Sequence, residues 1–147
     1  MKAIDTISPL IGITLSSIIV YYLKNLETIG CECAMNEKRT YIFVYSSVVI
    51  AFNAFVLLYG GVDNLVKFYN KFPLTWAFPI IIAIAGIVNI VYTLQYIEDM
   101  KKLNCKCSKS PYRDMMYVLA IINAVSLGLT LVTGVFVGFL FAKALRK

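Results

Sequence analysis

Four long apolar segments alternate with short polar segments along the chain. The apolar segments cover residues 4–23, 41–59, 74–96 and 115–142, and their interiors contain no Asp, Glu, Lys or Arg. A bilayer core about 30 Å thick needs roughly 20 consecutive apolar residues per helix, and each segment is about that long or longer. The pattern predicts four transmembrane helices, packed as an all-α bundle in a single membrane domain, residues 1–147.

Composition supports this interpretation. Hydrophobic residues make up 60% of the chain and charged residues 15%, whereas soluble domains are about 45–50% apolar and about 25% charged. Little sequence is left for a soluble catalytic domain, so we predict that the protein is not an enzyme. The first segment carries only Lys2 before Asp5 and lacks a small-x-small cleavage site, so we expect a retained helix and not a signal peptide.

The connections between the segments contain a repeated motif. Residues 24–40 and 97–114 each hold a C-x-C, and four crossings place these two connections on the same side of the membrane, opposite residues 60–73. An offset of 74 residues also aligns several other positions. The aligned pairs are Tyr22 with Tyr96, Leu23 with Ile97, Ile29 with Leu103, Cys31 with Cys105, Cys33 with Cys107, and Arg39 with Arg113. We therefore predict two similar helical hairpins, residues 1–59 and 74–142, related by a pseudo-twofold axis along the membrane normal.

The cysteine pattern allows three states. A disulfide inside one C-x-C is strained, so bridges between Cys31 or Cys33 and Cys105 or Cys107 are the more natural pairing. The four thiolates are alternatively a tetrahedral zinc site, although paired zinc ligands are usually spaced by two to four residues. Free thiols are the third possibility. A redox catalyst is disfavoured because Glu32 beside Cys31 would disfavour a thiolate there and the chain has no histidine.

Charge excludes further classes. The formal net charge is +6, but the basic residues are scattered over all loops and tails, which argues against nucleic acid and favours lipid headgroups or an acidic partner. Eight basic residues lie on the cysteine side and six on the other, which favours cytoplasmic cysteine loops. Without ionisable groups at membrane depth, pumps and transporters of charged substrates are disfavoured, and we expect no small-molecule substrate and no resident cofactor beyond the zinc alternative.

Two groups of residues are candidates for contacts. Arg39 and Arg113 occupy matching positions just before a helix, and together with Lys38 and Tyr112 they are our candidates for contact with a partner protein. Gly134 and Gly138 form a G-x-x-x-G in the last segment, a spacing that lets helix backbones approach closely.

Residues 29–42 and 103–114 each place a C-x-C and then polar residues and a basic residue before an aromatic-rich helix. In this the chain resembles small membrane proteins of large nucleocytoplasmic DNA viruses. The resemblance implies a virion component of the internal membrane beneath an icosahedral capsid, in contact with minor capsid or other membrane proteins. It also implies viral thiol oxidases that form disulfides on the cytoplasmic side. The second loop departs from the first because Pro111 and Tyr112 replace Glu37 and Lys38.

We therefore predict a structural membrane protein that anchors a neighbouring protein layer through its cysteine-bearing loops. The first alternative is a small channel or transporter, with Asn53, Asn89, Asn123 and Thr130 lining the pore. The second alternative is a membrane thiol oxidoreductase.

Overall fold

The chain is helical throughout the part that the structure describes. The computed structural model describes residues 3–145, with side chains described except at 3–5, 73, 76, 130–131 and 133–145. In order, the elements are α1 Ala3–Thr28, η1 Glu32–Ala34, α2 Glu37–Leu58, α3 Val62–Lys71, η2 Pro73–Trp76, α4 Ala77–Lys102, η3 Lys106–Ser108 and α5 Pro111–Leu145. The predicted all-α class is confirmed.

Three of these helices are long and apolar enough to cross a membrane. They correspond to Thr6–Thr28, Glu37–Leu58 and Ala77–Lys102, in α1, α2 and α4. The helix α5 covers the fourth predicted segment, but most side chains in its second half lie outside the described residues. Gly134, Gly138 and Thr130 are among these, so the four-span count and the packing role of both glycines stay predictions.

The long helices continue beyond the apolar segments into the polar loops. The helix α2 begins at Glu37, four residues before its apolar segment, because the Asn36 side chain accepts a hydrogen bond from the Arg39 amide at 2.9 Å. Such a cap satisfies an amide at the helix start that has no partner within the helix. The helix α4 carries Lys101 and Lys102 in its last turn, where positive charge complements the helix dipole.

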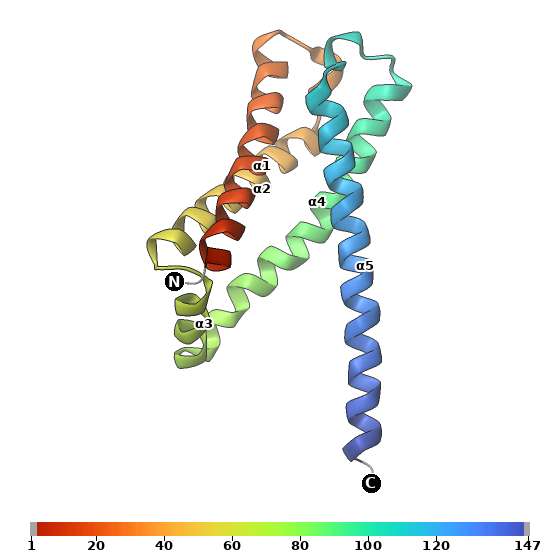
Figure 1. Ribbon diagram of the computed structural model, residues 1–147. Coiled ribbons are helices and arrows are strands. Elements are labelled where there is room, and N and C mark those ends of the chain that lie inside the picture. Colours follow the sequence, from red (N-terminus) through yellow and green to blue (C-terminus); the bar gives the residue numbers. More distant parts are fainter. Residues whose placement is uncertain (1–2, 146–147) are drawn as a thin grey trace.

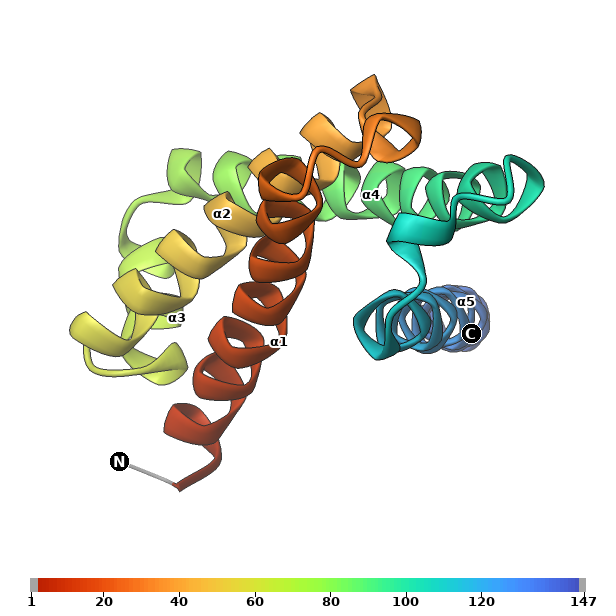
Figure 2. The ribbon, with the colours of Figure 1, turned by 90° about the horizontal axis from the view of Figure 1, so that it is seen from above.

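The four long helices meet at one end, and below it α5 separates from the other three (Figure 1). The other three stay in contact there, since Gly12 of α1 lies against Asn53 of α2 and Phe52 of α2 packs on Phe78 of α4. Figure 1 shows both cysteine-bearing connections together at the upper end, with the last turns of α5 at the opposite end. Seen from above, α4 and α5 cross at a wide angle, and α1 and α2 lie against each other (Figure 2). The arrangement is therefore more open than a bundle with parallel axes, and the loops are its meeting point.

The middle connection, residues 60–73, contains a short amphipathic helix, α3. Leu65 and Tyr69 are buried against Val56, with Phe52 and Phe68 packed around them. These two residues lie one turn apart, so they share a face of the helix. Burial raises the pKa of the Tyr69 hydroxyl. The apolar positions of α3 repeat at helical spacing, but the sequence interpretation treated this segment only as a connection.

Candidate functional site: a disulfide-bridged pair of loops

The main buried core surrounds the two cysteine loops. We call residues 22–42 and 96–116 the cysteine head. Residues 22, 23, 26, 31, 34 and 42 are all buried, and so are the residues 74 positions later: 96, 97, 100, 105, 108 and 116. The same positions are therefore buried in both loops, while the pseudo-twofold relation of two hairpins stays a prediction.

Each loop begins with the same helix-ending turn. The Cys31 amide donates to the Leu26 carbonyl at 3.0 Å, and the Cys105 amide donates to the Met100 carbonyl at 3.0 Å. This six-to-one bond needs a left-handed residue just after the helix, and Gly30 (φ 65°) and Asn104 (φ 47°) supply it. Glycine and asparagine are the residues that adopt this conformation most readily.

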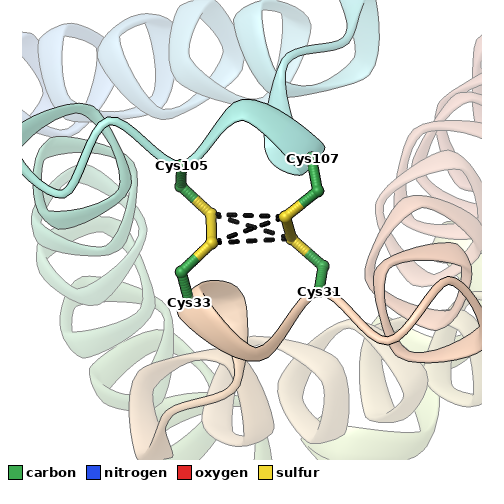
Figure 3. A group of neighbouring side chains, drawn as sticks. All are labelled: Cys31, Cys33, Cys105 and Cys107. Atoms are coloured by element: carbon green, nitrogen blue, oxygen red, sulfur yellow. Dashed lines mark hydrogen bonds between the residues drawn. A yellow bond between two sulfur atoms is a disulfide. The ribbon is translucent and has the colours of Figure 1, made fainter.

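After the turn, each C-x-C motif encloses the start of a single 3₁₀ turn. The turns η1 and η3 begin directly after Cys31 and Cys105, and each includes the second cysteine of its motif. The chain thereby projects both sulfurs of one motif toward the opposite loop, as Figure 3 shows.

The four cysteines form two disulfides between the loops. Cys31 is bonded to Cys107 with their Cα atoms 5.8 Å apart, and Cys33 is bonded to Cys105 with a Cα separation of 6.0 Å (Figure 3). All four cysteines lie in the described part of the chain, and none of them is free. Of the three cysteine states considered from sequence, the structure holds the cross-loop disulfides. The covalent links join segments more than 70 residues apart and fix α1 and α2 to α4 and α5.

Beneath the bridges, two buried tyrosines make reciprocal hydrogen bonds. The Tyr22 hydroxyl of α1 donates to the Ser108 carbonyl at 2.9 Å, and the Tyr96 hydroxyl of α4 donates to the Ala34 carbonyl at 3.0 Å. Each tyrosine therefore joins a helix of one half to the loop of the other half. Because a buried polar group must be paired, these bonds also fix the relative position of the loops.

The predicted partner contacts Arg39 and Lys38 make intramolecular contacts. The Arg39 side chain is only 13% exposed and donates to the Leu23 carbonyl at 2.9 Å and to Glu27 at 2.8 Å. Lys38 pairs with Asp99 of α4 at 2.6 Å. These contacts join α2 to α1 and to α4. Sequence reasoning placed both cations at the head but did not reveal these internal ion pairs.

The matching residues of the second half have different neighbours. Arg113, 12% exposed, lies 3.5 Å from Asp114. The position equivalent to Glu27 is occupied by Lys101, whose ammonium lies 4.4 Å from the Tyr117 ring centre. The Tyr112 ring packs against Tyr21 with centroids 6.0 Å apart. A partner role for Arg113 and Tyr112 stays a prediction.

The three candidate pore residues whose side chains are described, Asn53, Asn89 and Asn123, are not gathered at one place. Asn89 and Asn123 line a cavity of about 490 Å³ beside α4 and α5, together with Tyr45 of α2. The Asn53 amide instead donates to the Val49 carbonyl of its own helix at 2.8 Å. The Oδ1 atom of Asn89 is buried without a hydrogen-bond partner.

Sequence reasoning missed two exposed apolar residues on the head. Ile29 is 53% exposed and Leu103 65% exposed, and both lie in the turns that precede the cysteine loops. Met35, just after η1, is exposed as well. The 74-residue offset already paired Ile29 with Leu103, and apolar residues inside polar loops were the available signal.

Comparison with known proteins finds no family model, no curated protein and no solved structure that matches the chain.

Proposed function

We propose that this chain is a structural integral membrane protein that holds a rigid cysteine head at the membrane surface for contact with a neighbouring protein. The observation that carries the proposal is the contrast between the cysteine head and the long helices below it. Buried residues, disulfides and interhelical hydrogen bonds gather in the head. The helices below it present apolar side chains outward.

The exposed apolar surface of the helices supports a membrane location. Exposed large hydrophobic residues recur along the helices below the head, among them Ile7, Leu10, Ile11, Val44, Val48, Phe55, Ile80, Ile81, Ile84, Ile122, Val125 and Leu129. Apolar patches of this extent are rare on soluble monomers. Lipid is the solvent in which they are stable, and the proposed protein crosses it four times.

The exposed face of the head supports a contact with another protein. Ile29, Leu103 and Met35 expose apolar side chains at the end of the molecule that leaves the membrane. Exposed charged residues, among them Glu32 and Lys106, lie in the same two loops. Apolar residues inside a polar rim are typical of protein interfaces. Together with the viral resemblance of the two loop segments, this makes a minor capsid or membrane protein of a virion internal membrane the proposed neighbour.

Site-specific photocrosslinking tests the proposal. A photoreactive amino acid is introduced at Ile29 or at Leu103 in the full chain, in its native membrane or particle, and adducts are identified by mass spectrometry under non-reducing conditions. We expect one reproducible protein adduct from both positions. The matched controls are Leu58 and Leu74, which are each 88% exposed and lie beside α3 at the opposite end.

The proposed contact also predicts the effect of substitution. Ile29→Ser combined with Leu103→Ser removes the adduct that a probe at Met35 forms, while Leu58→Ser combined with Leu74→Ser leaves it unchanged. If the head positions yield only lipid adducts, or the same adducts as the control positions, the anchoring proposal is wrong.

One observation favours the channel as a second candidate. Asn89 and Asn123 line the same cavity at membrane depth, and the side-chain oxygen Oδ1 of Asn89 has no hydrogen-bond partner. Polar side chains inside a membrane protein often line a water-filled path. Ion flux in liposomes that is lost on Asn89→Leu and kept on Asn53→Leu supports a channel, whereas absence of flux in the unaltered protein excludes it. The oxidoreductase alternative stays a prediction, tested by turnover of a dithiol and its loss on Cys33→Ser.

A further inference from the structure

The four sulfur atoms are arranged almost as the corners of a tetrahedron. All lie within 4.8 Å of one another. Besides the two bonded pairs, the remaining four separations are 3.8 Å for Cys31 and Cys33, 3.7 Å for Cys105 and Cys107, 3.7 Å for Cys31 and Cys105, and 3.4 Å for Cys33 and Cys107. Figure 3 shows these four contacts as dashed lines between the two bridges.

These separations match a zinc site with four cysteine ligands. Zinc bonds thiolate sulfur at about 2.3 Å in a tetrahedral site, which places the sulfurs about 3.8 Å apart. Four of the six edges of that tetrahedron are therefore present within a few tenths of an ångström. The two bonded pairs would separate by side-chain rotation once their bonds are broken, while both loops keep their hydrogen-bonded turns.

The redox conditions on the loop side decide which state exists. The distribution of basic residues favours a cytoplasmic head, and the cytosol keeps protein thiols reduced unless a dedicated oxidase acts. Reduced, the head loses its two covalent links and holds four thiols in a small volume. In this reduced state, a metal ion that binds thiolates would link the two loops again.

We propose that the head is a two-state joint, closed by two disulfides when oxidised and by one zinc ion when reduced. In the first step, four equivalents of a thiol reductant give up electrons and protons, forming two external disulfides, and the two protein disulfides become four thiols. In the second step, the four thiols lose four protons and bind one Zn²⁺ through Cys31, Cys33, Cys105 and Cys107. This inference goes beyond the proposed function and does not depend on the identity of a partner.

The charge of the head suits an anionic metal centre. One Zn²⁺ with four thiolates carries a net charge of −2. Residues 22–42 and 96–116 contain eight basic and six acidic side chains, a balance of +2. Lys106 lies between the two cysteines of the second loop and Glu32 between those of the first, so the charge that suits the centre is the overall balance of the head. Cys31 and Cys105 are buried, so half of the ligand set is shielded from water.

Cobalt binding tests the proposal on the full chain in detergent. The protein is reduced with a phosphine under anaerobic conditions, freed of reductant and titrated with Co²⁺. We expect about one metal per chain and the strong visible absorption of a tetrahedral cobalt thiolate centre, lost when Zn²⁺ displaces the cobalt. The oxidised protein is expected to bind neither metal at this site.

Two variants make the test specific. Cys33→Ser combined with Cys107→Ser is expected to weaken binding by more than about 100-fold, because half of the ligands are removed. Met35→Ser, the control, removes an exposed sulfur from the same loop and keeps full binding. Circular dichroism is recorded throughout, and a reduced protein that has lost helix is expected to regain it on addition of Zn²⁺.

The outcomes separate this proposal from the proposed function. A reduced, helical protein that binds less than a stoichiometric amount of cobalt, or binds it with a weak octahedral spectrum, overturns the zinc site. Loss of helix on reduction that Zn²⁺ does not reverse overturns it too. Neither result affects the photocrosslinking experiment, which is carried out on the native, unreduced protein.

Discussion

The paired tyrosines of the head provide the sharpest test of its internal order. Tyr22 and Tyr96 are almost fully buried, and each hydroxyl donates to a carbonyl of the opposite loop, Ser108 at 2.9 Å and Ala34 at 3.0 Å. Replacing either with phenylalanine keeps the ring and its packing and removes one oxygen. The change therefore isolates the hydrogen bond from the apolar contacts.

The expected cost follows from the burial of the acceptors. Ala34 and Ser108 are inaccessible to water, so a carbonyl that loses its phenol donor cannot turn to solvent instead. Leaving a buried polar group unpaired costs about 1–3 kcal/mol. We expect Tyr22→Phe and Tyr96→Phe each to lower the free energy of unfolding by about 1–2 kcal/mol. The double variant is expected to depart from additivity by at least about 0.5 kcal/mol, because both bonds cross the same pair of linked loops.

The measurement is unfolding of the oxidised protein in mixed micelles, titrated with a denaturing detergent and followed by circular dichroism. Tyr21→Phe is the matched control. Tyr21 is a neighbour in sequence and is exposed, so its substitution is expected to change stability by less than about 0.5 kcal/mol. If both buried variants are as stable as the control, the cross-loop hydrogen bonds do not hold the head together.

Two further predictions use the unequal halves of the head. Arg39→Gln is expected to lower the free energy of unfolding by about 1–2 kcal/mol, because Arg39 donates to the Leu23 carbonyl and to a carboxylate. Arg113→Gln is expected to cost about half as much or less, because its contact with the exposed Asp114 is long. Equal costs in the same titration contradict this. Gly30→Asn is expected to be nearly neutral, as Asn104 already occupies the equivalent left-handed position, while Gly30→Val costs about 1–3 kcal/mol through backbone strain.

Much of the helical structure could be predicted because lipid imposes a simple rule. In a bilayer every backbone polar group must be bonded within the segment, so long apolar runs become helices whatever their partners. The C-x-C spacing disfavours a bond within either motif, so cross-loop pairing was the expected form of any disulfide, but zinc and free thiols stayed open. The specific pairs, Cys31 with Cys107 and Cys33 with Cys105, depend on how the loops face each other and were not predictable.

Other features escaped prediction because they depend on tertiary neighbours. From the sequence alone, Arg39 is expected to be a surface cation. In the fold, α2 returns along α1 and places Arg39 beside Glu27 and the Leu23 carbonyl. The helix α3 is short and polar overall, and it is held by burial of Leu65 and Tyr69 against α2. A short helix gains most of its stability from such packing and little from propensity, so the sequence alone showed only a connection.

In the membrane location proposed above, the concentration of order in the cysteine head follows from the solvent that each part meets. Between lipid-facing helices the hydrophobic effect supplies little attraction, since lipid is as apolar as the side chains it would release. At the head, water is present and burial of apolar residues stabilises contact. Accordingly, the main core lies where Tyr22, Tyr96 and the four cysteines meet, and α5 separates from the other long helices below it (Figure 1). The bridges therefore act on the part of the molecule that sets the relative positions of the helices. Opening both of them without a replacement link is expected to loosen α1 and α2 from α4 and α5, while each long helix persists.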